Sequence, residues 1–276
     1  MKDIVANRSR ISLTDKWRAG LLALRENGLV WCACLGTYYV ASAIANRAFS
    51  AMDRLRRERN LPGLNSATLN KHIWQSWDWS AQGDEWSQSK EWEESLVRSV
   101  LHRYIPNRGR VLEIGPGGGR WTAHLLERAE DYVGVDISAT CVAHCQKRFA
   151  AASGARFLVG SGRDLTGVDS ASIDSIWSFD AFVHINAREV DGYITEFARV
   201  LRPGGTAVIH HGAVGGSLGG WRSNLTANSL HEMVRRSGLR IEQVLTSWAG
   251  AAGTQNMTHG DQITVMSKPA DVQSGA

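Results

Sequence analysis

Short apolar runs alternate with longer amphipathic stretches from residue 92 onward. The apolar runs predict strands at 110–114, 132–135, 156–159, 173–178, 206–210, 240–245 and 262–266. The stretches with helical spacing predict helices at 92–104, 120–129, 139–151, 190–201 and 225–237. Strands that alternate with helices of this length favour right-handed crossovers and parallel pairing. The pattern therefore predicts an α/β fold with a seven-stranded, mostly parallel sheet and helices on both faces.

The first 65 residues follow a different pattern and are predicted to form an N-terminal helical arm (1–65). Residues 27–46 carry no charge, and an arginine cluster follows them, at Arg54, Arg56, Arg57 and Arg59. This uncharged stretch has nearly the length that crosses a bilayer, but few of its side chains are strongly apolar. The favoured interpretation is a helix buried against the body or a second subunit. Contact with an anionic membrane surface and a true membrane span are the alternatives. The arm thus predicts a homo-oligomer or a membrane-surface contact.

Composition and charge narrow the class of protein. The chain has 276 residues, 43% hydrophobic and 21% charged, which excludes collagen-like and disordered classes. Residues 1–60 hold 11 Lys or Arg against 5 Asp or Glu, and the remainder holds 20 against 22. Because the excess positive charge belongs to the arm, no nucleic-acid partner is predicted. The four cysteines match no standard zinc spacing, which favours reduced thiols in a cytoplasmic protein, with the arm allowing contact with the inner membrane surface.

A glycine-rich turn, Gly115–Gly119 (GPGGG), follows the first predicted strand, where glycines let the backbone pass close to a ligand. A dinucleotide site would need glycine at position 120, where Arg120 stands. Glu113, just before the turn, would repel a diphosphate and suits a cationic amino-acid head group instead. Asp136 ends the next strand and is placed to accept hydrogen bonds from ribose hydroxyls. A ligand that combines ribose with an ammonium group and lacks phosphate is S-adenosylmethionine.

Four segments in order resemble the class I S-adenosylmethionine-dependent methyltransferases. They are 113–119 (EIGPGGG), Asp136, 174–180 (DSIWSFD) and 201–205 (LRPGG), and the resemblance covers residues 92–267. It implies a Rossmann-like fold, with an S-adenosylmethionine-binding methyltransferase domain over residues 92–276 and a Trp-rich cap segment over 66–91. The residues that the resemblance implies at the cofactor are Glu113, Gly115, Gly117, Trp121, Asp136, Ile137, Gly162, Arg163, Ser178 and Phe179.

The adenine end departs from the family pattern at one position. Many relatives have an acidic residue just after the third strand, near the adenine amino group, and here Ser161 stands there. Asp164 is one candidate to take over this contact. Backbone groups of Gly162 and Arg163 are the other, and the sequence does not decide between them.

A tryptophan-rich segment precedes the domain and bears on the acceptor. Residues 74–86 carry four tryptophans, whose faces suit the C–H faces of sugar rings. A hydrophobic staple that locks the arm to the body is the competing interpretation. Trp77, Trp79 and Trp248 are the tryptophans expected at the acceptor.

Histidines and acids after the fourth and fifth strands are the candidate catalytic groups. His184, four residues after Asp180, is predicted to act as a general base oriented by that carboxylate, with helix capping as the alternative. Either His210 or His211 should face the site, because strand side chains alternate. His211 is assigned to the catalytic group and His210 to the acceptor. If Mg²⁺ is used, Asp180, His211 and Asp261 are its candidate ligands.

A narrower resemblance concerns the acceptor. The arm (RENGLVW), the WDW segment, SFDAFVHI and IHHG together look like bacterial methyltransferases of glycan assembly, among them enzymes of mycobacterial polymethylated polysaccharides. This resemblance implies O-methylation of a sugar hydroxyl in methylated mannose or glucose polysaccharide biosynthesis, with a small molecule or oligosaccharide as acceptor. The alternatives are N- or O-methylation of a small natural product and a non-catalytic, cofactor-binding assembly protein.

Overall fold

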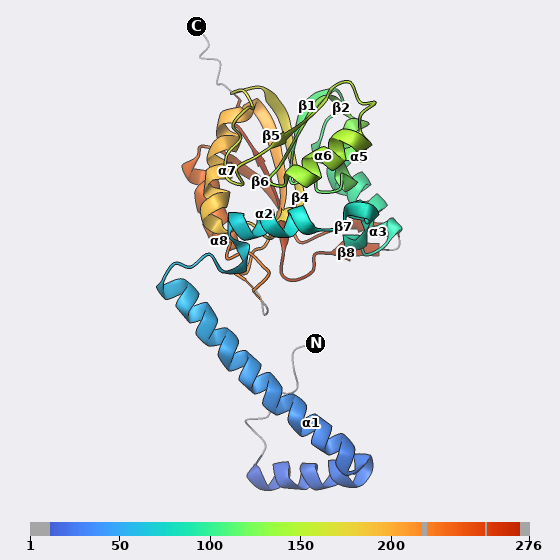
Figure 1. The fold of residues 1–276 in the computed structure, drawn as a ribbon, viewed down its shortest axis with the longest axis vertical. Coiled ribbons are helices and arrows are strands. Elements are labelled where there is room, and N and C mark those ends of the chain that lie inside the picture. Colours follow the sequence, from blue (N-terminus) through green and yellow to red (C-terminus); the bar gives the residue numbers. More distant parts are fainter. Residues whose placement is uncertain (1–11, 217–219, 252, 271–276) are drawn as a thin grey trace. The chain divides into compact units, whose positions relative to one another are not determined.

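The chain divides into two units, Met1–Leu61 and Pro62–Ala276. The structure, a computed structural model, describes residues 12–216, 220–251 and 253–270. Figure 1 shows the course of the chain through both units. The tryptophan-rich segment 66–91 lies in the second unit, together with all the predicted strands.

The first unit is a long helix, α1 (Leu13–Glu58). Its N-cap is Ser12, whose hydroxyl accepts a hydrogen bond from the backbone N–H of Asp15. The helix is broken at Gly28, which has φ 79° and ψ 169°. In the described part of the chain, Thr14–Glu58 is the one helix that is long and apolar enough to cross a membrane.

The second unit alternates helices and strands. Its helices are α2 (Ala67–Ser76), α3 (Lys90–Leu96), α4 (His102–Tyr104), α5 (Arg120–Leu126), α6 (Ala139–Arg148), α7 (Ala187–Val200) and α8 (Ala227–Arg236). Shorter helical turns lie at Gly63–Asn65, Trp79–Ala81, Asp84–Trp86 and Val97–Leu101. Its strands are β1 (Gly109–Ile114), β2 (Ala129–Asp136), β3 (Ala155–Val159), β4 (Ile173–Phe182), β5 (Leu201–His211), β6 (Arg240–Leu245), β7 (Ser247–Gly250), β8 (Gly253–Asn256) and β9 (Gln262–Ser267).

Seven strands form one sheet in the order β3-β2-β1-β4-β5-β9-β6. Pairs among β3, β2, β1, β4 and β5 are parallel, whereas β9 runs antiparallel to β5 and to β6. The predicted seven-stranded, mostly parallel sheet is therefore confirmed. The hairpin of β7 and β8, which forms a separate two-stranded sheet, was not predicted.

Side-chain alternation along the strands builds one core on each face of the sheet. Leu112 and Ile114 pack in the core that includes buried side chains of α7 and α8. Val111, which precedes them on the opposite face, packs in the core that includes buried side chains of α3, α5 and α6. Figure 1 shows α5 and α6 on one side and α7 and α8 on the other. The strand order reverses between β1 and β4, which places a ligand crevice at their carboxyl ends.

Candidate functional site

A cavity of about 290 Å³ lies at this switch point. The strand ends that line it are those of β1, β2, β4 and β5. Its other walls come from α2, from the turns around residues 79–86 and from loops after β4, β5 and β8. The cavity lining includes the side chains of Trp74, Trp79, Trp86, Arg120, Trp121, Asp136, Ile137, Phe179, Asp180, His184, His210, Arg222 and Asp261.

The glycine turn forms the floor of the cavity beside Asp136. Gly115 and Gly117 have φ of 71° and 56°, in the left-handed region that favours glycine. A Cβ on Gly115 would lie 2.6 Å from the Cβ of Ala181, so the turn also needs glycine for space. The backbone N–H of Gly117 donates to Oδ2 of Asp136, at 3.1 Å. The turn and the acid at the end of β2 therefore form one hydrogen-bonded unit.

Asp136 is 7% exposed and its carboxylate lines the cavity. Burial raises its pKa to about 6, while the hydrogen bonds donated by the N–H groups of Ser138 and Gly117 act in the opposite direction. Each carboxylate oxygen accepts one backbone N–H and keeps further acceptor capacity. Asp136 can therefore accept the two hydroxyls of a ribose without losing its bonds to the backbone.

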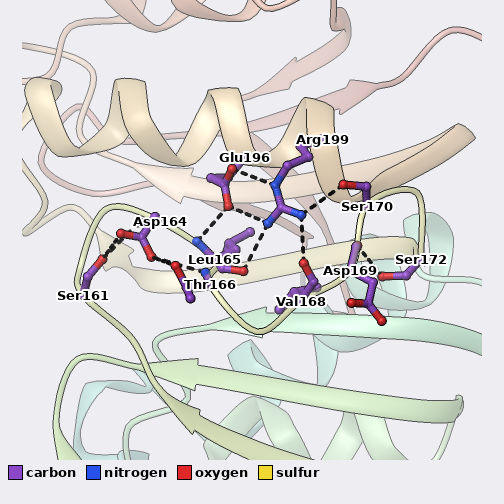
Figure 2. A network of polar contacts seen from close by, with 10 residues as sticks. All are labelled: Ser161, Asp164, Leu165, Thr166, Val168, Asp169, Ser170, Ser172, Glu196 and Arg199. Atoms are coloured by element: carbon purple, nitrogen blue, oxygen red, sulfur yellow. Dashed lines mark hydrogen bonds and ion pairs between the residues drawn. The ribbon is translucent and has the colours of Figure 1, made fainter.

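The loop between β3 and β4 is held in place by α7. Figure 2 shows Arg199 and Glu196 facing this loop from the helix. The guanidinium of Arg199 donates to the carbonyls of Leu165 and Val168, at 3.1 and 2.8 Å, and pairs with Glu196. Glu196 in turn accepts the N–H of Leu165, at 3.0 Å. These bonds fix the loop that brings Gly162 to the cavity.

Asp164 and Arg163, two of the residues considered for the adenine contact, lie outside the cavity lining. The carboxylate of Asp164 accepts the hydroxyls of Ser161 and Thr166, as Figure 2 shows, and does not line the cavity. Arg163 is exposed and is also absent from the cavity wall. Gly162 and Ile137 are the residues that the structure places at this end.

Glu113, expected at the cofactor, does not line the cavity. Its alternation along β1 points it into the core beneath α5, where it is 1% exposed. Its Oε2 accepts the hydroxyl of Thr122, at 2.6 Å, and that of Tyr132. Burial raises the pKa of Glu113 to about 7, against the lowering effect of these two hydrogen bonds. Glu113 thus joins β1, β2 and α5 from below the glycine turn.

Two neighbouring β4 residues, Ser178 and Phe179, lie on opposite faces. Ser178 is buried and donates to the carbonyl of Ile114 at 2.7 Å, so it does not line the cavity. Phe179 does line it, with its ring 5.1 Å from that of Trp121. The indole Nε1 of Trp121 is buried and has no hydrogen-bond partner among the described residues. An apolar wall with one unused donor therefore adjoins the glycine turn.

His184 lines the opposite part of the cavity and is half-buried. Its Nδ1 lies 3.0 Å from the carbonyl oxygen of Trp221. A carbonyl only accepts, so Nδ1 carries the proton and Nε2 keeps a lone pair. Burial lowers the pKa of His184, which keeps the ring neutral near pH 7. A neutral imidazole with a free lone pair can accept a proton from a hydroxyl.

Asp180 does not orient His184, as the sequence suggested, but belongs to a row of five polar groups, two arginines, two carboxylates and a histidine. It pairs with Arg120 on one side and with Nδ1 of His210, at 3.0 Å, on the other. Nε2 of His210 lies 3.3 Å from Asp261, which pairs with Arg222. Burial alone would raise the pKa of Asp180, but hydrogen bonding to His210 and the charges of His210 and Arg120 outweigh it and lower the pKa to about 2.

The two arginines of this row were missed from the sequence. Arg120 was considered only as a departure from a dinucleotide motif, yet it is 6% exposed and lies 4.5 Å above the ring of Trp121. A charged residue at the start of an otherwise buried helix, next to a tryptophan, is a signal that could have identified it. Arg222 lies between the strand predicted at 206–210 and the helix predicted at 225–237, and it has no such signal.

His211 and Trp248 lie away from the cavity, so their assignments to the site are corrected. His211 alternates to the face opposite His210, where its Nε2 is 2.8 Å from the hydroxyl of Thr264. Trp248 is buried in the core, and its Nε1 donates to the hydroxyl of Ser95 at 2.9 Å. Among residues 12–216, 220–251 and 253–270, no group of three or more His, Cys, Asp or Glu side chains is arranged to hold a metal ion. The proposed Mg²⁺ ligand set is therefore not assembled, since His211 points away from Asp180 and Asp261.

The tryptophan-rich segment closes the cavity over the glycine turn. Trp74, Trp79 and Trp86 line it and contact one another, with ring centroids 5.6 to 6.1 Å apart. Trp77 is 40% exposed and lies outside the lining, where its Nε1 donates to Glu85. Of the two tryptophans predicted here, only Trp79 therefore adjoins the cavity.

Comparisons with known proteins agree with this arrangement. Residues 111–205 match the family model described as a methyltransferase domain. A fatty-acid O-methyltransferase of Mycolicibacterium smegmatis is 34% identical over 102 residues, which cover 35% of this chain and 34% of that protein. The biotin biosynthesis bifunctional protein BioHC of Cellvibrio japonicus is 33% identical over 116 residues, 41% of this chain and 22% of that protein. The chain thus spans about a third or less of the length of these two curated relatives.

Solved structures share the fold at low identity. A chain of the complex between the Haloferax volcanii Trm112 methyltransferase activator and its methyltransferase has a TM-score of 0.54 at 21% identity, covering 69% of this chain and 96% of that one. The CurJ carbon methyltransferase has a TM-score of 0.53 at 16% identity, covering 70% and 59%. The [4+2]-cyclase SpnF has a TM-score of 0.50 at 18% identity, covering 71% and 84%. The matched domain model spans the segment from β1 to the start of β5, which holds the glycine turn and Asp136, and the solved structures share the fold.

Proposed function

We propose that the protein is an S-adenosylmethionine-dependent O-methyltransferase that acts on a hydroxyl group of a sugar. The observation that carries the proposal is a single cavity with Asp136 and the glycine turn in one wall and His184 in another. The first wall suits a ribose, and the second holds a base for a hydroxyl acceptor.

The residues present suit the cofactor. The glycine turn leaves room for a ligand, Asp136 has free acceptor capacity, and Trp121 offers an unused buried N–H. S-adenosylmethionine, when bound, supplies an electrophilic methyl group on a positively charged sulfur. Glu113 would act on this ligand only through the elements that it holds together, since it faces away from the cavity.

His184 supports proton removal from the acceptor. An alcohol is a poor nucleophile until its proton leaves, and Nε2 of His184 has the lone pair that can take it. The chain fixes this tautomer through the carbonyl of Trp221, and the ring also packs 5.5 Å from Trp74. A positioned base of this kind contributes about 10²- to 10⁴-fold in rate.

The charges in the cavity favour a neutral hydroxyl over a carboxylate acceptor. A fatty acid would need a cation to receive its carboxylate. Among the described lining residues, both arginines are already paired, Arg120 with Asp180 and Arg222 with Asp261. Because no arginine among them is left to receive a carboxylate, we propose a different acceptor from the fatty acid named for the Mycolicibacterium relative. The tryptophan faces of the cap support a sugar, because indole rings stack on sugar C–H surfaces.

The proposal is tested in two steps with the purified full chain. Calorimetry first measures binding of S-adenosylmethionine and S-adenosylhomocysteine. Transfer from methyl-labelled S-adenosylmethionine is then assayed on mannosides, glucosides, phenols, amines and fatty acids, with the methylated position mapped in each product. Transfer to a sugar oxygen supports the proposal, and transfer to a carboxylate or an amine refutes the acceptor. Binding without transfer to any acceptor would favour a non-catalytic role or another reaction, as the cyclase with this fold illustrates.

A further inference from the structure

We propose that residues 29–46 of α1 insert into a lipid bilayer and anchor the protein to a membrane. The inference concerns the first unit and does not depend on the proposed function. It departs from the favoured interpretation of the sequence, which was a helix buried against protein.

The length of the uncharged helix matches the hydrocarbon thickness of a bilayer. No Asp, Glu, Lys or Arg occurs between Arg25–Glu26 and Arg47, and the helix is continuous after Gly28. At 1.5 Å per residue, the 18 residues from Leu29 to Asn46 extend about 27 Å, against about 30 Å for the hydrocarbon core. These 18 residues fall at the short end of the range of about 17 to 25 residues found for membrane-spanning helices.

The apolar side chains of this segment surround the helix instead of forming one stripe. Leu29, Val30 and Ile44 are 74%, 78% and 64% exposed. At 100° per residue, Tyr38 and Trp31 point to the side opposite Leu29, and both are also exposed. A water-soluble pair of helices buries one stripe and leaves a polar face outside, but this segment has no charged face. Lipid surrounds a helix with apolar groups on every side, and it therefore matches the distribution of apolar side chains around this segment.

Two polar side chains of α1 form hydrogen bonds with carbonyls of their own helix, an arrangement that hydrocarbon favours. The hydroxyl of Thr37 donates to the carbonyl of Ala33, at 2.9 Å. The side-chain amide of Asn27 donates to the carbonyl of Ala23, at 3.1 Å. The bond of Thr37 lowers the cost of placing its hydroxyl in lipid, and the bond of Asn27 does the same at the boundary of the segment.

Both flanks carry groups that suit the interface and anionic headgroups. Before the break at Gly28, Trp17, Leu21 and Leu24 share one helix face, and all three are exposed. Such a face lies naturally along a membrane surface, with the break allowing a change of direction. After the segment, the four arginines of the cluster outnumber the acidic residues Asp53 and Glu58, and a positive excess of this kind suits acidic lipids.

Flotation of the full chain tests the anchor. Purified protein is mixed with vesicles of phosphatidylethanolamine and phosphatidylglycerol, floated through sucrose, and washed with 1 M salt and then with carbonate at high pH. The anchor predicts that the protein floats and resists both washes. The double variant Val40→Arg/Ile44→Arg, charged in the middle of the segment, is expected to lose at least tenfold in the floated fraction.

The matched control is Met52→Arg/Leu55→Arg, which places the same two charges on exposed positions of α1 beyond the segment and should float like the original chain. Circular dichroism and S-adenosylhomocysteine binding check that each variant is folded. Release by salt would show peripheral attachment and overturn insertion. Absence of flotation with a dimer in sedimentation would show that a second copy covers the helix, and an intact mass lacking the arm would show a removed leader. Either result, or flotation of the Val40/Ile44 variant, overturns the proposal.

Discussion

Replacing Glu113 by glutamine should make the free energy of unfolding less sensitive to pH. Burial raises the pKa of Glu113 from its ordinary 4.5 to about 7, so the folded chain retains a proton that the unfolded chain loses between these values. The free energy of unfolding therefore falls as pH rises through this window, and the loss is complete above about pH 7. The full cost corresponds to about 3.4 kcal/mol. Glutamine does not ionise, so the variant does not lose this free energy of unfolding as the pH rises.

The measurement compares the Glu113→Gln variant with the original chain in urea, followed by tryptophan fluorescence at pH 5, 6, 7 and 8. The difference in the free energy of unfolding, variant minus original, should rise by about 2.5 kcal/mol from pH 5 to pH 8. A constant offset from altered hydrogen bonds to Thr122 and Tyr132 does not affect this slope, and Asp136 titrates in both proteins. Glu232→Gln, at an exposed site on α8, is the control and should show no slope. A flat or falling difference for Glu113→Gln would mean that this carboxylate is ionised throughout, contrary to the burial argument.

Further outcomes are expected for the site and for the loop that supports it. Asp136→Asn should weaken S-adenosylmethionine binding roughly 10- to 100-fold in calorimetry, because a charged acceptor for the ribose is lost; unchanged affinity would remove Asp136 from the ribose site. His184→Ala should lower kcat by about 10²- to 10⁴-fold with cofactor affinity within about twofold, whereas His211→Ala should lower stability by roughly 1–3 kcal/mol and leave cofactor affinity intact. The acid limb of the kcat profile should lie below pH 6.5, because burial lowers the pKa of His184 and protonation abolishes the base; a limb above that value would exclude it. Arg199→Met should loosen the loop between β3 and β4, seen as faster amide exchange at Leu165, and should weaken cofactor binding severalfold; unaltered exchange would contradict the clamp.

The sheet was predictable from the sequence because its signals are local. Each buried strand is a short apolar run, and the turn at Gly115–Gly119 needs a residue type that only glycine supplies. The carboxyl end of β4 was harder. The strand continues to Phe182 through an irregular register at Asp180, whose φ of 66° no periodicity signals.

The site was only partly predictable because partners come from distant segments. Asp136 follows from its place at a strand end, but the pairing of Asp180 with Arg120 and His210 depends on which face each strand turns inward. The choice between His210 and His211 has the same origin, since a shift of one residue moves a side chain to the other face. Likewise Glu113 was assigned by its nearness to the glycine turn, although alternation along β1 points it into the core.

The row Arg120–Asp180–His210–Asp261–Arg222 constrains how this wall can vary. Each carboxylate neutralises the arginine that it pairs with, so losing one member of either pair leaves an opposite charge in a poorly solvated place. Natural variation is then expected to proceed by joint replacement, an arginine disappearing together with its acid. To admit a negatively charged acceptor, a designer should accordingly replace Asp261 and keep Arg222. The guanidinium of Arg222 would then be free to bind the acceptor's negative charge.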